Sequence, residues 1–277
     1  MFPAVEHRGR DAFGFMWWDG GGSIKTRKVV GRATKNLSFL DIPHDARWWI
    51  GHVRLATHGT ERYPGNNHPL VHGEWIGVHN GIVCNYRSIL KETGREDPKA
   101  AVDSEAILAA VDAYGLKAGL KKVIGDMAAA LVDRKNPATV YLVRGETSPL
   151  WLGRSVTGAW YFASEAAVLR ELGIAWDEDA LPSPLSEYHL VTIDGTGLLQ
   201  CQKYQDRPPT DRWSRYRCGY PLHYESLWPS MECLDCGWAD WTGEWPASLV
   251  TACPACGEPN LYVHDRPIAD IAAGATA

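Results

Sequence analysis

The sequence of 277 residues contains no apolar run that approaches the roughly 18 residues of a membrane-spanning helix. It also lacks an excess of positive charge, because 28 Lys and Arg are set against 33 Asp and Glu for a net charge of −5. This balance excludes a strongly basic protein that binds nucleic acid through its overall charge. Residues 1–7 show neither the charged leader nor the hydrophobic core of a secretory signal. We therefore expect a cytoplasmic protein, with neither a membrane nor nucleic acid as its partner.

Cysteine is almost absent from the first two thirds of the chain, where Cys84 stands alone, and seven cysteines are too few for a disulfide scaffold of this length. Two pairs follow near the C-terminus, Cys233-x-x-Cys236 and Cys253-x-x-Cys256, sixteen residues apart. Zn²⁺ prefers four thiolates in a tetrahedron, and two such pairs supply them. A site closed by four cysteines has no open coordination position, so we predict a structural zinc ion in a zinc ribbon. Free thiols or a redox pair are the alternative interpretation.

A turn-rich break at residues 206–211 predicts a domain boundary, with one domain at 1–207 and a linker plus zinc ribbon at 208–277. From Cys218 onward the chain carries a single cation, Arg266, and eight Asp and Glu. Because this acidity opposes contact with phosphates, the tryptophans around the first cysteine pair favour docking to a protein partner. We expect the last ten residues to form a flexible tail.

Short strand-like runs and a few amphipathic helical runs alternate over residues 11–208, which predicts an α+β fold. The predicted strands cover residues 12–18, 48–54, 75–79, 128–133, 139–144, 150–153, 159–163, 189–193 and 198–203. The predicted helices cover residues 86–92, 104–114, 117–124 and 165–172.

Histidine is concentrated in one part of the chain. Six of the ten histidines lie there: His44, His52, His58, His68, His72 and His79. Because imidazole is the commonest transition-metal ligand, the cluster makes a metal hydrolase one alternative. The spacing does not favour it, since the region has no His-Glu-x-x-His helix and no carboxylate at a recognisable ligand offset.

Four short motifs place polar residues at the ends of predicted elements. They are Arg-Leu-Ala-Thr-His-Gly at 54–59, Asn-His-Pro at 67–69, His-Asn-Gly-Ile at 79–82 and Asp-Ser-Glu at 103–105. Each alone has a structural explanation. Arg54 suits a surface ion pair, and His58 or His68 suits a core histidine with satisfied hydrogen bonds. Asn80-Gly81 suits a type I′ hairpin turn, and Asp103 or Ser104 suits a helix N-cap.

Together and in this order, the motifs resemble the glutaminase domain of the class II glutamine amidotransferases, the family of glucosamine-phosphate synthase and amidophosphoribosyltransferase. The resemblance covers roughly residues 5–205. It includes Arg-Gly-Arg-Asp at 8–11, Pro-Leu-Trp-Leu-Gly at 149–153 and Phe-Ala-Ser-Glu at 162–165. It implies an Ntn-hydrolase-like αββα sandwich, in which two antiparallel sheets stack between helices. Compared with the family, the opening strand and the first helix are not found in this sequence.

The resemblance also implies a site for glutamine. Arg54 would hold the α-carboxylate through bidentate, charge-assisted hydrogen bonds, and Asp103 would bind the α-ammonium group. The Asn80 side-chain amide and the Gly81 backbone N–H would donate to the oxyanion that forms when the substrate amide is attacked. By the same analogy three further residues line the pocket: Thr57, His58 and His68. We expect His79 to be structural.

In this family the attacking group is an N-terminal cysteine whose own α-amine is the base. The sequence begins with Met1-Phe2, so we predict that the chain as written is inactive and that a Met-Cys-Gly opening lies upstream. With that opening, glutamine would be hydrolysed through a thioester to glutamate and ammonia. Cys84 is a poor substitute nucleophile, because it follows the oxyanion motif and has no amine base beside it. We interpret it as a small buried core residue.

Two non-enzymatic functions are alternatives: a glutamine-binding protein without activity, and a zinc-ribbon adaptor that docks a partner. For the enzyme, the sequence does not identify the acceptor of ammonia, and it shows no Gly-rich phosphate loop. We therefore expect the acceptor either on a partner, such as a synthase or an acceptor-binding protein, or at the ribbon.

Overall fold

The computed structural model describes five segments of the chain and the backbone of four short strands near its C-terminus. The segments are residues 2–36, 45–55, 60–94, 102–174 and 185–206. The chain divides into two compact units, Met1–Ser164 with Val168–Tyr216 and Glu165–Ala167 with Arg217–Ala277. The predicted boundary after residue 207 falls outside the described residues. Within those residues, no helix has both the length and the apolar character of a membrane span.

A six-stranded antiparallel sheet forms the centre of the larger unit. Its strands are β4 (Leu70–His72), β5 (Trp75–Val83), β6 (Gly125–Asp133), β7 (Val140–Arg144), β10 (His189–Ile193) and β11 (Leu199–Lys203), in the order β11-β10-β7-β6-β5-β4. β6 is buried over its central seven residues, from Asp126 to Val132, so both of its faces are covered. This burial explains the nearly continuous run of small and apolar residues in that strand.

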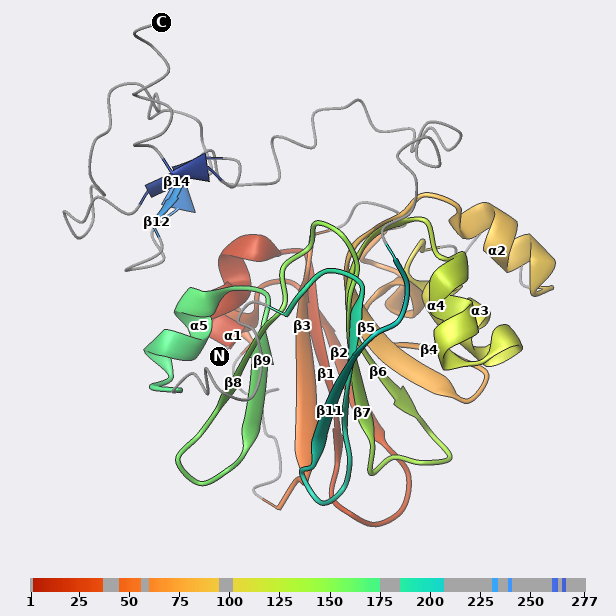
Figure 1. Cartoon of the computed structure of the whole chain (residues 1–277), viewed down its shortest axis with the longest axis horizontal. Coiled ribbons are helices and arrows are strands. Elements are labelled where there is room, and N and C mark those ends of the chain that lie inside the picture. Colours follow the sequence, from red (N-terminus) through yellow and green to blue (C-terminus); the bar gives the residue numbers. More distant parts are fainter. Residues whose placement is uncertain are drawn as a thin grey trace, which may run out of the picture. The chain divides into compact units, whose positions relative to one another are not determined.

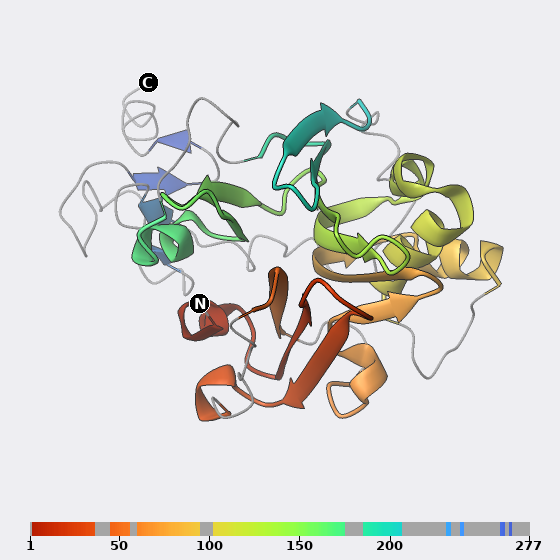
Figure 2. The ribbon, with the colours of Figure 1, turned by 90° about the horizontal axis from the view of Figure 1, so that it is seen from below.

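A second, three-stranded antiparallel sheet stacks on the first. It consists of β1 (Ala12–Trp18), β2 (Lys25–Val30) and β3 (Trp48–Arg54), in the order β2-β1-β3. Because side chains alternate along a strand, Met16 and Ile50 enter the core between the sheets, where they join Val78 and Leu142. A third, two-stranded sheet of β8 (Trp151–Arg154) and β9 (Trp160–Ala163) adds Leu152 to this core. Figure 2 shows the stacking from below.

Helices cover the outer faces of the two stacked sheets (Figure 1). The outer face of the six-stranded sheet packs against α2 (Tyr86–Glu92), α3 (Glu105–Tyr114) and α4 (Leu116–Lys122). On the other side, Phe2 of α1 (Phe2–Val5) packs against Phe13 and Phe15, which point outward from β1. α5 (Ala166–Glu171) buries Val168 and Leu169 next to β9. The prediction of an α+β fold with two antiparallel sheets stacked between helices is therefore confirmed.

Each of the predicted strands and helices is present, with ends that differ by a few residues. The sequence-based prediction missed α1, β2, β4 and three short 3-10 helices at Glu6–Arg8, Ala33–Lys35 and Pro64–Asn66. The type I′ turn at Asn80-Gly81 is wrong, because β5 continues through both residues and pairs with β6 as far as Val83. Cys84 follows β5 and is only partly buried, so its interpretation as a buried core residue is also wrong.

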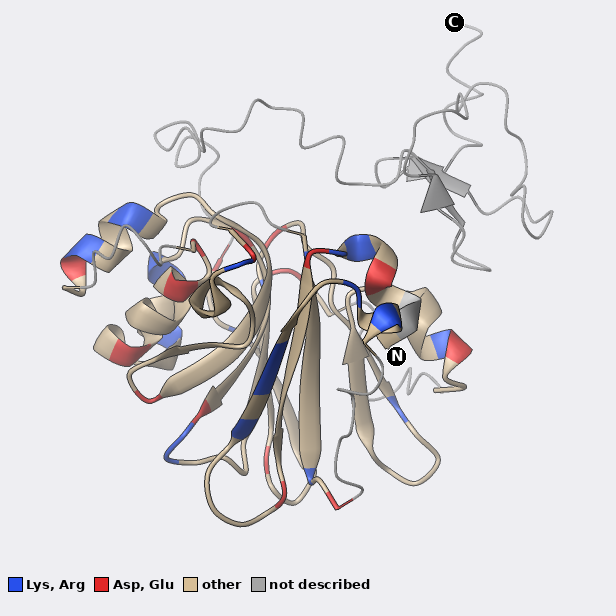
Figure 3. Ribbon diagram, turned by 180° about the vertical axis from the view of Figure 1, so that it is seen from behind, with Lys and Arg blue, Asp and Glu red and all other residues tan. Residues whose placement is uncertain are grey.

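The smaller unit contains a four-stranded antiparallel sheet in the order β13-β12-β14-β15. Its strands are β12 (Met231–Cys233), β13 (Ala239–Asp240), β14 (Leu261–Val263) and β15 (Arg266–Pro267). In the larger unit, charges of both signs are interspersed over the helices and loops (Figure 3). Strand β2 differs from this mixture, because it carries three positive charges, Lys25, Arg27 and Lys28, and no negative charge.

Candidate active site

Arg54 is the last residue of β3, and its side chain is buried although it carries a charge. Only 5% of the residue is exposed, and Nη1 donates a hydrogen bond of 2.9 Å to Oδ1 of Asn67. Asn67 is held in turn, because its Nδ2 donates to the carbonyl oxygen of Glu61 at 2.7 Å. Burial lowers the pKa of the Arg54 guanidinium, whereas nearby carboxylates, including that of Asp103, act in the opposite direction. The interpretation of Arg54 as part of a surface ion pair is therefore wrong.

Asp103 lies just before α3 and is 3% exposed. Its Oδ2 accepts a hydrogen bond of 2.8 Å from the backbone N–H of Val83, the last residue of β5. The N-cap position of α3 is Ser104, whose side chain makes no capping hydrogen bond. Asp103 thus ties the start of the helix to β5. Because it also interacts electrostatically with Arg54, the structure brings buried groups of opposite sign into one neighbourhood.

Gly81 occupies a backbone conformation that other residues rarely adopt. Its φ is +124°, and a Cβ atom at this position would lie 2.2 Å from the carbonyl oxygen of Asp126 and 3.0 Å from Nε2 of His79. The close approach of β6 therefore requires glycine here. The preceding residue, Asn80, is partly buried, and its Oδ1 lies 3.1 Å from Nε2 of His52.

His79 connects the Asn80-Gly81 segment to the start of α3. Its Nδ1 lies 2.9 Å from the hydroxyl of Ser104, and its Nε2 lies 3.1 Å from the carbonyl oxygen of Asp126. A carbonyl oxygen only accepts, so Nε2 carries the proton and Nδ1 accepts from Ser104. These buried contacts agree with the structural part expected for His79. They place Asn80, Gly81 and Asp103 on elements that are hydrogen-bonded to each other.

His68, which is buried, and His52, which is partly buried, form a second pair with ring centroids 4.2 Å apart. Burial, together with the neighbouring His79, lowers the pKa of His52 to about 3. Burial and the neighbouring His52 lower the pKa of His68 well below its ordinary value. Both ring nitrogens of His68 and Nδ1 of His52 are inaccessible, and they have no hydrogen-bond partner within the described residues. The interpretation of His68 as a histidine with satisfied hydrogen bonds is therefore wrong. Its backbone is accommodated by Gly14, whose Cβ would lie 2.1 Å from the His68 carbonyl oxygen.

Several predicted site residues lie outside the described part of the chain. These are Thr57, His58, Cys236, Cys253 and Cys256, and of Cys233 only the backbone is described. Among the side chains that the structure does describe, no group of three or more His, Cys, Asp or Glu could hold a metal ion. The metal-hydrolase alternative therefore gains no support from that part of the chain.

The sequence-based prediction missed four residues that shape the site: His52, Asn67, Ser104 and Asp126. A signal existed for His52, because it precedes Arg54 by two residues and so lies on the same face of a predicted strand. The position of Ser104 before a predicted helix suggested an N-cap, but its hydroxyl pairs with Nδ1 of His79. Asp126 acts partly through its backbone carbonyl, and sequence patterns carry no information on that contact.

Two stacked antiparallel sheets with a buried arginine and aspartate next to an Asn-Gly pair define an amidotransferase-type domain. Residues 39–202 match the family described as "Glutamine amidotransferase domain", and the chain belongs to this family. The predicted membership in the class II glutamine amidotransferases is thus confirmed at the level of the family.

The chain is similar to glutamine–fructose-6-phosphate aminotransferases. It is 30% identical over 178 residues to that of Campylobacter jejuni, covering 60% of this chain and 29% of the relative. With that of Gluconobacter oxydans it shares 28% identity over 217 residues, covering 73% of this chain and 35% of the relative. The chain therefore spans about a third of the length of these curated relatives.

Solved structures support the fold. Glutamine phosphoribosylpyrophosphate amidotransferase from B. subtilis, complexed with ADP and GMP, superposes with a TM-score of 0.61 at 17% identity, covering 74% of this chain and 45% of that chain. A structure described as the allosteric regulatory enzyme of purine biosynthesis gives a TM-score of 0.60 at 20% identity, covering 73% and 45%. At these identities the likeness concerns the fold alone, and it confirms the Ntn-hydrolase-like architecture.

Proposed function

We propose that the domain binds L-glutamine and hydrolyses its side-chain amide to glutamate and ammonia, which an acceptor then receives. The observation that carries the proposal is the buried pair of Arg54 and Asp103. A buried charge is costly unless it is paired, and two opposite charges at one site match the carboxylate and ammonium groups of a free amino acid.

The proposed reaction proceeds through a thioester. The proposed nucleophile is the thiol of an N-terminal cysteine that the printed sequence does not contain, and its own α-amine takes the thiol proton. The thiolate attacks the amide carbon and forms the C–S bond, and the C–N bond breaks as the protonated α-amine passes that proton to the departing nitrogen, which leaves as ammonia. Water then hydrolyses the thioester to glutamate. Asn80 and the N–H of Gly81 are proposed to stabilise the oxyanion, a contribution of about 3 to 4 kcal/mol per donor in other acyl-transfer enzymes. Thr57, His58 and His68 are proposed to line the pocket.

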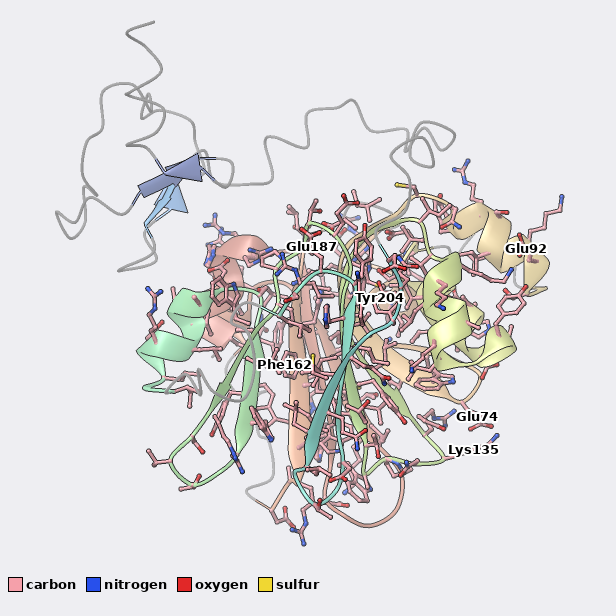
Figure 4. All side chains as sticks on the ribbon, viewed as in Figure 1. Glu74, Glu92, Lys135, Phe162, Glu187 and Tyr204 are labelled. Atoms are coloured by element: carbon pink, nitrogen blue, oxygen red, sulfur yellow. The ribbon has the colours of Figure 1, made fainter. Side chains whose placement is uncertain are left out.

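Calorimetric titration of L-glutamine into the purified chain tests the binding part of this proposal. Arg54→Lys keeps the charge but loses the planar fork, so we expect binding to weaken about 10- to 100-fold. Arg134→Lys is the matched control. Arg134 is exposed and directly follows β6. The next residue, Lys135, pairs with Glu74, and both of these are labelled in Figure 4. The proposal fails if the wild-type chain does not bind L-glutamine, or if both variants bind equally well.

We also propose that Cys233, Cys236, Cys253 and Cys256 hold a structural zinc ion. Strands β12 and β13 form a hairpin, and both cysteines of the first pair fall between Met231 and Asp240, which are partners in that hairpin. Cys233 stands opposite Leu261 at the start of β14, and the second cysteine pair lies just upstream of that residue. The spacing of the two pairs in the sequence, together with the register of Cys233, supports this proposal.

Elemental analysis tests the zinc proposal directly. We expect one zinc per chain, and none after Cys233→Ser or Cys253→Ser. Cys201→Ser is the matched control, because Cys201 is an exposed free thiol on β11 and should leave the zinc content unchanged. We further propose that the ribbon docks the partner that carries the acceptor. Pull-down with Cys233→Ser would then lose the partner while glutamine binding is retained. Zinc-free wild-type protein would overturn the proposal.

A further inference from the structure

We propose that His52 is a positioning residue that holds the side-chain amide of Asn80 in the orientation needed to stabilise the oxyanion. The inference rests on the function proposed above. His52 lies on β3 and Asn80 on β5, so the contact bridges the two stacked sheets. Nε2 of His52 lies 3.1 Å from Oδ1 of Asn80 and also 3.1 Å from the backbone carbonyl oxygen of His79.

The second contact determines which nitrogen of His52 carries the proton. A backbone carbonyl oxygen cannot donate, so Nε2 must be protonated to make the bond to His79. A protonated Nε2 in turn requires an acceptor from Asn80, because a flipped amide would bring two donors face to face. One N–H shared between two acceptors thus selects one of the two amide orientations, with Oδ1 toward His52.

The surroundings keep this arrangement in one protonation state. The groups that act on the His52 ring are His79 and Arg54, and the ring of His68 lies against it. Burial is the largest influence that disfavours a second proton, and the charges of His79 and Arg54 act in the same direction, whereas the hydrogen bonds to Asn80 and to the His79 carbonyl favour it. His79 is itself fixed through Ser104 and Asp126, so the carbonyl that orients His52 belongs to a constrained residue.

The selected orientation leaves the Asn80 amide nitrogen available. Within the described part of the chain, Nδ2 of Asn80 makes no hydrogen bond. Both of its protons are therefore free to serve as donors next to the N–H of Gly81. If Asn80 turned by 180° about its amide, an oxygen would replace that donor and repel a developing oxyanion. His52 thus acts on the reaction through Asn80 and not through the substrate.

A double-mutant cycle, made in the protein that carries the proposed N-terminal cysteine, tests the inference by steady-state ammonia release. Asn80→Ala should lower kcat at least about 100-fold. We expect His52→Phe to lower kcat about tenfold or more with KM changed less than about threefold, because glutamine binding does not involve it. His52→Gln, which restores an N–H near Nε2, should recover most of the rate. His52→Phe added to Asn80→Ala should cause no further loss.

The design includes a control variant, and it separates failure of the positioning role from failure of the proposed function. His189→Phe replaces an exposed histidine of β10 and should leave both constants unchanged. Additive losses in the cycle, or an effect of His52→Phe on KM alone, would overturn the positioning role while leaving the proposed function intact. If the protein that carries the N-terminal cysteine releases no ammonia, or if its Asn80→Ala variant keeps the full rate, the result counts against the proposed function instead.

A spectroscopic measurement decides the inference without relying on activity. Long-range ¹H–¹⁵N correlation spectra distinguish the two neutral imidazole tautomers and the cation. We expect His52 to show a proton on Nε2 only, between pH 5 and pH 8. A neutral ring with its proton on Nδ1 would have no donor toward Asn80, and the inference would fail. A charged ring at pH 6 would contradict the single protonation state on which the inference depends, and it would fail in that case too.

Discussion

We predict that the fold loses stability in acid because of His52, whose Nδ1 is inaccessible to solvent. In the folded protein its pKa is about 3, whereas an exposed histidine of the unfolded chain has a pKa near 6.5. Between these values the unfolded chain binds a proton that the folded chain does not. The free energy of unfolding therefore falls as the pH falls. From pH 7 to pH 5 the loss amounts to about 2 kcal/mol for this residue. The neighbouring His68, whose pKa is lowered in the same direction, adds to it.

The assay is urea unfolding at pH 7 and pH 5, followed by the fluorescence of the 13 tryptophans. His52→Gln removes the titrating ring, so the difference in unfolding free energy between the two pH values should shrink by about 2 kcal/mol. His189→Gln, at an exposed histidine, should leave it unchanged. Carboxylates stay mostly ionised at pH 5 and contribute little in this window. Equal pH dependence in wild type and His52→Gln would show that the folded protein protonates His52, and the reasoning would be refuted.

Two further substitutions test the contacts around β5. Gly81→Ala should destabilise the fold by at least about 2 kcal/mol, because φ is +124° and the new Cβ would meet the Asp126 carbonyl oxygen at 2.2 Å. A loss below about 1 kcal/mol in urea unfolding would contradict this. Ser104→Ala removes the donor to Nδ1 of His79 and leaves a buried nitrogen unpaired, at a cost of about 1 to 3 kcal/mol. Ser88→Ala, at an exposed hydroxyl, should change thermal stability much less, and equal effects would refute the assignment.

The elements that the sequence predicts are those whose side chains alternate or repeat around a buried face. β1 and β3 have clear apolar patterns, and α3 is buried along most of its length. β2 gives no such signal, because its sequence Lys-Thr-Arg-Lys-Val-Val is largely exposed. It is an edge strand of its sheet, where lysine is typical and protects against pairing with other chains. β4 has only three residues, too few for a period to be visible.

The prediction from local turn propensity fails where the pairing of two strands decides the backbone conformation. Asn80-Gly81 has the composition of a hairpin turn, yet β5 and β6 pair over nine residues and carry the strand through it. Arg54 and Asp103 could be predicted as site residues only because their motifs resemble those of a known family, since their positions alone suggested an ion pair and a helix cap. The hydrogen bond from His52 to Asn80 could not be predicted, since it depends on how two sheets stack.

Buried hydrogen bonds join the two halves of the site into one unit. Asp103 accepts the N–H of Val83, and His79 pairs with Ser104, so the residue proposed for the ammonium group and the oxyanion pair are fixed to each other through β5. In such a site the distance between head group and amide carbon is set by the strand and not by the substrate. If the head group binds at Arg54 and the amide at Asn80, as proposed, asparagine, with one methylene fewer, would not bring its amide to Asn80. Selectivity for glutamine would therefore appear mainly in the rate of amide cleavage, because both amino acids offer the same head group for binding.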